Sequence, residues 1–118
     1  MIEVKNLVKK YGNQKVVDNL SFTLKKGQIL GFLGPNGAGK STTMNMITGY
    51  ISPTSGSVSI DGYDILDEPE QAKRSVGYLP EMPPLYPDMT TKEYLKFVAE
   101  IKKVKKSERE NMILEIME

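Results

Sequence analysis

A glycine-rich stretch constrains the fold of this chain more than any other feature. Residues 34–41 have the pattern G-x-x-x-x-G-K-S, which begins at Gly34 and ends at Ser41. The stretch follows a short apolar run, Ile29 to Leu33, and precedes helix-forming residues that start at Lys40. A buried strand, a tight glycine loop and a helix in immediate succession are typical of α/β folds. We therefore expect an α/β fold built around this loop.

The same residues suit the binding of a dense anion. Glycines let the backbone curl so that several N–H groups point inward, beside the positive end of the following helix. Lys40 adds a positive charge for the outer phosphates of a nucleoside triphosphate, and the Ser41 hydroxyl is placed to ligate Mg²⁺. The pattern therefore predicts a P-loop that binds ATP with Mg²⁺, and a purely structural glycine turn is the minor alternative.

Strand patterns precede the loop. Apolar and polar residues alternate at Ile2 and Val4, and again from Leu20 to Leu24, which is typical of antiparallel strands wet on one face. Ile29 to Leu33 is apolar throughout apart from one glycine, which predicts a strand buried on both faces. The chain before the loop is thus expected to hold two antiparallel strands and one buried strand.

Behind the loop, helix and strand signals alternate. A helix is predicted from Lys40 to about Tyr50, and a short one over Asp67 to Lys73. Asp61-Gly62 predicts a hairpin turn. Three strands are expected here, at Ser57 to Ile60, Tyr63 to Ile65 and Val76 to Leu79, before a proline-rich loop from Pro80 to Asp88.

The last thirty or so residues read as helical. Thr90 and Ser107 each precede a glutamate by three residues, Glu93 and Glu110, which is the form of a capping box. No helix stop signal follows the second, so the chain is expected to end within a helix. Four lysines between the two helices are interpreted as a solvated helix end, with lipid phosphates or RNA as alternatives; they are Lys102, Lys103, Lys105 and Lys106.

Composition excludes several kinds of site. The 118 residues contain no cysteine and no histidine, so disulfides, thiolate metal sites and histidine bases are excluded. A net charge of +1 gives no global attraction to nucleic acid, and no nucleic-acid partner is expected. The apolar runs are far shorter than the roughly 20 residues that cross a bilayer, which favours a cytoplasmic location.

Several motifs in order resemble one family. The P-loop is accompanied by Lys10-Tyr11-Gly12, the strand and turn from Leu20 to Gly27, Pro53-Thr54-Ser55-Gly56, Asp61-Gly62, and Val76-Gly77-Tyr78-Leu79-Pro80-Glu81. Together they resemble the N-terminal half of the ATP-binding subunit of ABC (ATP-binding cassette) transporters, in the exporter-like subgroup. The resemblance implies a P-loop NTPase core with an N-terminal antiparallel β subdomain over residues 1–89, and the start of a helical subdomain over residues 90–118. The rest of the domain would lie outside this chain.

The resemblance also implies roles for individual residues. Tyr11 would stack on adenine and Val16 would touch the base or sugar. The phosphates and the metal would be bound by the loop and the helix start, at Asn36, Gly37, Ala38, Gly39, Lys40, Ser41 and Thr42. Glu81 stands where the family's glutamine loop contacts Mg²⁺ and the attacking water, so it is a candidate catalytic and metal residue alongside Lys40 and Ser41.

By the same resemblance the chain would be part of a transport motor. Two ATP-binding subunits would pair head to tail, and the loop from Glu81 to Tyr86 would face a transmembrane permease, placing the protein at the inner face of the cell membrane. The signature loop and the acidic residue that polarises water are absent from these residues, so hydrolysis by this chain alone is expected to be poor. A soluble ABC-type ATPase remains an alternative, as does an unrelated P-loop kinase or GTPase, which nucleotide preference would separate.

Overall fold

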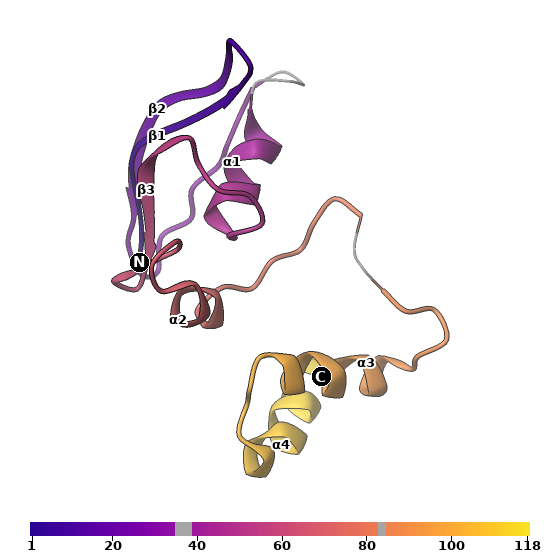
Figure 1. Cartoon of the computed structure of the whole chain (residues 1–118). Coiled ribbons are helices and arrows are strands. Elements are labelled where there is room, and N and C mark those ends of the chain that lie inside the picture. The colour runs from indigo at the N-terminus through magenta and orange to yellow at the C-terminus, as the bar shows by residue number, and fades with distance from the viewer. Residues whose placement is uncertain (35–38, 83–84) are drawn as a thin grey trace. The chain divides into compact units, whose positions relative to one another are not determined.

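The computed structural model describes residues 1–34, 39–82 and 85–118, and the chain divides into two compact units (Figure 1). The first unit spans residues 1–78 and the second spans residues 79–118. In the described residues the first unit holds a four-stranded sheet and two helices, and the second holds two helices. An antiparallel sheet followed by helices is the α/β arrangement that the sequence predicts.

The sheet is antiparallel throughout and has the strand order β2-β1-β3-β4. Its strands are β1 (Ile2–Tyr11), β2 (Gln14–Leu24), β3 (Ser55–Ile60) and β4 (Tyr63–Asp64). Ile2 of β1 lies opposite Leu24 of β2 and opposite Ile60 of β3, so β1 is paired on both sides. The alternation at both strands before the loop therefore predicted their pairing correctly.

Two short turns set the register of the sheet. Gly12 and Asn13 join β1 to β2, and Gly12 has a φ of 62°. Asp61 and Gly62 join β3 to β4 with φ values of 51° and 84°, which is the left-handed pair that a two-residue hairpin requires. The hairpin predicted at Asp61-Gly62 is thus confirmed.

A bulge interrupts β1 at Asn6. The register with β2 shifts between Val4 and Leu7, and Asn6 has a φ of 49°. The Asn6 N–H donates to the Ser21 hydroxyl oxygen at 2.8 Å, so a side chain of β2 satisfies the backbone group that the bulge removes from the ladder. On the other side, a Cβ atom at Gly56 would lie 2.2 Å from the Asn6 carbonyl oxygen. Only glycine fits at position 56 without moving β1.

Helix α1 (Lys40–Ile47) and helix α2 (Pro69–Arg74) complete the first unit. Met46 and Ile47 of α1 and Ala72 of α2 join a buried cluster with sheet residues; the sheet and its flank contribute Val4, Leu7, Val17, Val58, Ile60 and Ile65. Figure 1 shows α1 lying against the sheet. Burial of these side chains supplies the main favourable term for folding this unit.

Two predicted strands do not form. Ile29 to Leu33 and Val76 to Leu79 have no strand pairing, and Ile29, Leu33 and Leu79 are 100%, 99% and 79% exposed. A strand forms only where a neighbouring strand shares its hydrogen bonds, and no described strand pairs with either segment. The first segment is held instead by Phe32, whose ring meets Phe22 of β2 edge-on at a centroid distance of 5.3 Å. Several apolar side chains of these segments are therefore exposed.

The second unit begins its helices with a capping box. Helix α3 (Thr91–Ile101) has Thr90 as its N-cap. The Glu93 N–H donates to the Thr90 hydroxyl at 3.2 Å, and the Thr90 N–H donates to the Glu93 carboxylate at 3.1 Å. Both reciprocal bonds of the predicted motif are present, so this helix start was predicted correctly.

The second predicted capping box is wrong. Helix α4 (Lys106–Met117) starts one residue before Ser107, its N-cap is Lys105, and no side chain caps it. The Glu110 carboxylate pairs with the Lys92 ammonium of α3 at 2.9 Å. This cross-helix ion pair directs the glutamate toward α3 and not toward the start of its own helix.

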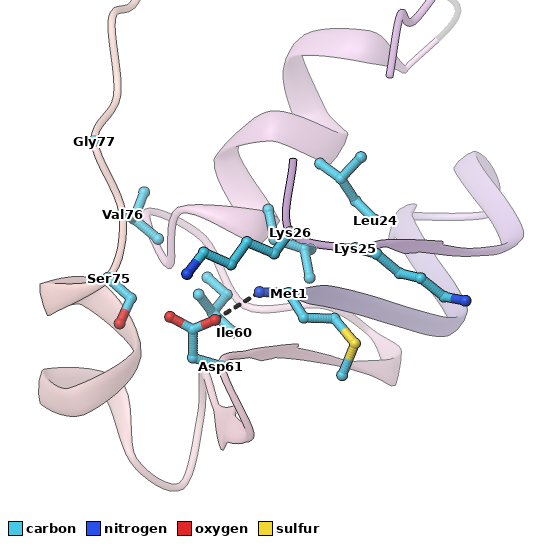
Figure 2. A pocket seen from close by; sticks show the side chains of 10 residues that line it. Met1, Leu24, Lys25, Lys26, Ile60, Asp61, Ser75, Val76 and Gly77 are labelled. Atoms are coloured by element: carbon cyan, nitrogen blue, oxygen red, sulfur yellow. Dashed lines mark hydrogen bonds and ion pairs between the residues drawn. The ribbon is translucent and has the colours of Figure 1, made fainter. Parts of the chain in front are cut away.

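An ion pair links β1 and β3 at one end of their ladder. The Met1 ammonium donates to Asp61 Oδ1 at 2.5 Å, at the rim of a pocket of about 460 Å³ that Lys26 and Ser75 also line (Figure 2). The hydrogen bond from this ammonium, and then one from the Ser75 hydroxyl, hold the pKa of Asp61 below its ordinary value of 3.8. Folding therefore favours the ionised form of this carboxyl group.

This pair predicts a pH dependence of stability. Because the pKa of Asp61 is lower in the folded chain, its stabilising contribution is complete above the unfolded value of 3.8 and is lost as pH falls through the folded value. As pH falls below about 4, the free energy of unfolding should therefore decrease less in Asp61→Asn than in the parent chain. Urea denaturation at a series of acidic pH values measures this, and parallel curves for the two proteins would show that the pair contributes nothing.

Candidate phosphate-binding site

The start of α1 is built against the backbone of β2. Gly39 is the N-cap of α1, is buried, and has a left-handed φ of 89°. A Cβ atom there would lie 2.6 Å from the Val16 carbonyl oxygen, so any side chain would collide with the backbone of β2. The helix start can therefore approach the sheet this closely only because residue 39 has no side chain.

A buried threonine fixes the first turn of α1. Thr43 is the one buried polar side chain within residues 1–34, 39–82 and 85–118, at 3% exposure. Its N–H and its hydroxyl both donate to the Gly39 carbonyl, at 2.9 Å and 2.8 Å. The first carbonyl of the helix thus accepts two hydrogen bonds, which holds Gly39 in place and leaves the N–H groups of the first turn available to an anion.

Lys40 is the first residue of α1 and links the two ends of the glycine-rich segment. It is half-buried, and its ammonium donates to the Gly34 carbonyl oxygen. The first turn of α1 carries no acidic residue. The helix dipole and Lys40 therefore add positive potential at the same place, without a carboxylate to oppose it.

A pocket of about 290 Å³ opens beside this helix start. Residues 16–18 of β2 form part of its lining. The rest includes Phe32, which contacts β2, and Gly39 and Lys40 at the start of α1. Apolar side chains make up much of its lining, to which Lys40 and Asp18 add one basic and one acidic side chain. This arrangement fits a ligand with a flat apolar part and an anionic part, which is the chemistry of a nucleotide.

The predicted residues of the helix start lie together. Gly39, Lys40, Ser41 and Thr42 are consecutive through the N-cap and first turn of α1, with Ser41 exposed and Thr42 half-buried. The backbone of Val16 lies against Gly39. Asn36, Gly37 and Ala38 lie outside the described residues.

The other two predicted site residues, Tyr11 and Glu81, belong to other parts of the chain. Tyr11 ends β1, is 54% exposed, and carries the Lys9 ammonium 5.3 Å from its ring centre. The ring therefore contacts a cation, while about half of the residue is exposed. Glu81 is exposed and belongs to the second unit, whereas α1 belongs to the first.

Two residues near the site were missed from the sequence. Thr43 was overlooked because a helical threonine is a common residue, although its spacing of four from Gly39 was the signal for a hydroxyl that bonds back to that carbonyl. Asp18 lines the pocket, and Lys15 Nζ lies 3.5 Å from its Oδ1. No local pattern marks Asp18, since its place depends on how β2 passes the helix.

The residues fit a magnesium ion that is bound largely through phosphate. The described part of the chain has no group of three or more acidic residues able to hold a metal. Mg²⁺ in nucleotide sites takes one or two protein ligands and keeps phosphate oxygens and waters for the rest. Ser41, which is exposed in the first turn of α1, carries a hydroxyl group of the kind that can serve as one such ligand.

Comparison with known proteins decides the family. The family model described as ABC transporter matches residues 17–118. The chain belongs to the ABC transporter family. It is 40% identical over 118 residues to the linearmycin resistance ATP-binding protein LnrL of Bacillus subtilis, and 40% identical over 117 residues to the bacitracin transport ATP-binding protein BcrA of Bacillus licheniformis. These alignments cover 100% and 99% of the chain, and the chain spans 38% of the length of each relative.

Solved structures of this family share the fold. An ATP-binding subunit of an ABC transporter matches 94% of the chain and 46% of its own length, with 38% identity and a TM-score of 0.85. The ATP-binding cassette MJ0796, solved as a dimer bound to ADP and Pi, matches 98% of the chain and 55% of its own length, with 28% identity and a TM-score of 0.78. These matches confirm the fold class and the family predicted from the motifs. No helix in the described part of the chain has the length and apolar character that crossing a bilayer requires.

Proposed function

We propose that this chain is the N-terminal portion of an ABC ATP-binding domain, and that it binds ATP with Mg²⁺ as part of a transport motor. The observation that carries the proposal is the start of α1, where a left-handed Gly39 is seated on the β2 backbone and Lys40 faces Gly34. The relatives named for linearmycin resistance and bacitracin transport support a role in transport.

Each residue of the site has a proposed role. The N–H groups at residues 36–40 and the Lys40 ammonium bind the phosphates, the Ser41 hydroxyl ligates Mg²⁺, and Thr42 reaches the inner phosphate. Tyr11 stacks on adenine, and Val16 touches the base or sugar at the apolar part of the pocket lining. When bound, the metal neutralises charge on the outer phosphates.

The exposed segments point to what completes the domain. We propose that Ile29 to Leu33 pairs with a strand from the part of the relatives' length that this chain does not span, since an apolar segment with unpaired backbone lacks a neighbour here. The groups that hold and polarise the attacking water are proposed to lie there as well. Hydrolysis then needs the whole domain and its head-to-tail partner subunit, and this chain alone should hydrolyse ATP poorly.

The proline-rich loop is proposed as the contact with a transmembrane permease at the inner face of the membrane. Tyr86 packs its ring edge-on against Phe97 of α3 at a centroid distance of 5.8 Å, so this end of the loop is anchored on its own unit. Met82 and Leu85 are 85% and 64% exposed. They are the side chains proposed to meet the permease, while Glu81 is proposed to reach the metal and water once the domain is complete.

Nucleotide selectivity tests the proposal. Calorimetric titration should give binding of Mg-ATP and much weaker binding of Mg-GTP, and Tyr11→Ala should weaken Mg-ATP binding about tenfold because base stacking is worth about 1–3 kcal/mol. Tyr63→Ala is the matched control, since Tyr63 is an exposed tyrosine on β4 of the same sheet. Preference for GTP would favour an unrelated P-loop protein, and equal effects of the two substitutions would remove Tyr11 from the site.

A further inference from the structure

Helix α1 begins without a side-chain cap. Its N-cap is Gly39, which has no side chain to accept a hydrogen bond, and no side chain in the described part of the chain caps the helix. A serine or aspartate at this position would accept a bond from an N–H group of the first turn. The helix start therefore lacks the stability that a cap contributes, but its N–H groups are not engaged by a capping side chain.

Thr43 strengthens the same turn through an acceptor instead. Its N–H and its hydroxyl donate to the Gly39 carbonyl oxygen at 2.9 Å and 2.8 Å. A carbonyl oxygen has two lone pairs, so it accepts both bonds. The side chain is 3% exposed, so its hydroxyl is held in a buried place where this bond satisfies it. Thr43 thus stabilises the helix start without using any of the N–H groups that precede it.

The Gly39 carbonyl belongs to the same planar peptide group as the Lys40 N–H. A carbonyl that accepts a hydrogen bond polarises its peptide group, and in chains of hydrogen bonds this strengthens the next bond by about 10–30%. Lys40 is the first residue of α1, so its N–H is one of the donors that a helix leaves without an intrahelical acceptor. The Thr43 hydroxyl therefore acts, through one peptide group, on a donor at the proposed phosphate site.

We propose that Thr43 is a positioning residue of the phosphate site, acting through the Gly39–Lys40 peptide group. Its hydroxyl fixes the orientation of that group and makes the Lys40 N–H a stronger donor to a phosphate oxygen. The inference rests on the proposed binding of Mg-ATP and deepens it, because it assigns a role to a hydroxyl whose own hydrogen bond lies within the helix.

A second threonine of α1 makes the same kind of bond away from the site. Thr48, the C-cap, donates from its hydroxyl to the Met44 carbonyl oxygen at 2.9 Å, again four residues back. That carbonyl shares its peptide group with the Asn45 N–H, which lies inside the helix and not at its start. If the two hydroxyls only stabilised the helix, their loss would affect ligand binding equally.

Calorimetric titration of the whole chain with Mg-ATP tests the role. Thr43→Val keeps the branched shape but removes the hydroxyl, and should weaken binding about three- to tenfold, which is the size of one hydrogen bond. Thr43→Ser keeps the hydroxyl but loses a buried methyl group, so it should be less stable than the parent and still bind within about twofold. Thr48→Val is the matched control and should also bind within about twofold.

Adenosine provides a measurement without phosphate. Its affinity, measured by NMR titration, should be the same in the parent chain and in Thr43→Val, because its proposed contacts at Tyr11 and Val16 are unchanged. A general loss of structure would weaken the binding of both ligands. If thermal unfolding shows that Thr43→Val does not fold, Thr43→Ala removes the same hydroxyl and takes its place in the comparison.

Either of two results would overturn the inference. Equal Mg-ATP affinities of the parent and Thr43→Val would show that the hydroxyl has no part in binding. Equal losses in Thr43→Val and in Thr48→Val or Thr43→Ser would assign the effect to helix stability. Lys40→Ala separates this inference from the proposed function. Unchanged affinity in Lys40→Ala would remove the phosphate site itself, whereas a loss there with none in Thr43→Val would contradict only the role of Thr43.

Discussion

Lys40→Ala is expected to abolish most of the affinity of this chain for Mg-ATP, by about ten- to a hundredfold. The ammonium at the first residue of α1 is proposed to bind the outer phosphates, and hydrogen bonds to charged groups contribute about 1.5–3 kcal/mol. The dipole of α1 remains in the variant, so weak binding should persist. Calorimetric titration with Mg-ATP measures the loss directly.

The control for this experiment is an exposed lysine elsewhere. Lys26→Ala makes the same change of charge near the other end of the sheet, and should leave Mg-ATP affinity within about twofold because screening removes long-range effects at physiological salt. Lys40→Arg keeps the charge but presents a wider planar group and should recover only part of the binding. If Lys40→Ala and Lys26→Ala had similar affinities, the phosphates would have to bind away from α1.

Gly56→Ala is expected to cause the largest loss of stability, about 2–5 kcal/mol. Gly56 has a left-handed φ of 84°, and a Cβ atom there would lie 2.2 Å from the carbonyl oxygen and 2.6 Å from the carbonyl carbon of Asn6. The left-handed conformation costs a residue with a side chain about 1–2 kcal/mol, and displacing the backbone of β1 adds about 1–3 kcal/mol. Urea denaturation of the two proteins gives the difference in unfolding free energy.

Gly62→Ala separates the two contributions. Gly62 also has a φ of 84°, but nothing lies within 4 Å of its added Cβ atom. It should therefore lose only the conformational contribution, about 1 kcal/mol. The difference between the two losses of unfolding free energy is the contribution of the contact between β3 and the Asn6 bulge. A difference near zero would show that β1 can move away from a side chain at position 56 without destabilising the sheet.

The sequence predicted correctly those elements that are determined by a few consecutive residues. The hairpin at Asp61-Gly62 needs two residues that tolerate positive φ, and the start of α3 needs Thr90 and Glu93 three residues apart; both requirements are met within a few residues. The start of α1 was predicted in the same way, because Gly39 and Lys40 follow one another at the beginning of the helix.

The wrong predictions depend on partners distant in sequence. Ile29 to Leu33 and Val76 to Leu79 have the composition of buried strands, but a strand also needs a neighbour, which composition does not supply. The start of α4 was misjudged because Glu110 meets Lys92 of another helix. The close contact between Gly39 and the Val16 backbone could not be predicted either, because it depends on where β2 lies relative to α1.

Strand β1 pairs with both β2 and β3, and this pairing links the sheet to the segment that contains α1. β2 ends at Leu24 and β3 begins at Ser55, and both strands pair with β1, so about 30 residues that include the glycine-rich segment and α1 form a closed loop. Closing a flexible loop of that length costs about 3 kcal/mol of chain entropy. Pairing of β2 and β3 with β1 already brings the two ends of this segment together, so the sheet meets part of the entropy cost of assembling the proposed nucleotide site.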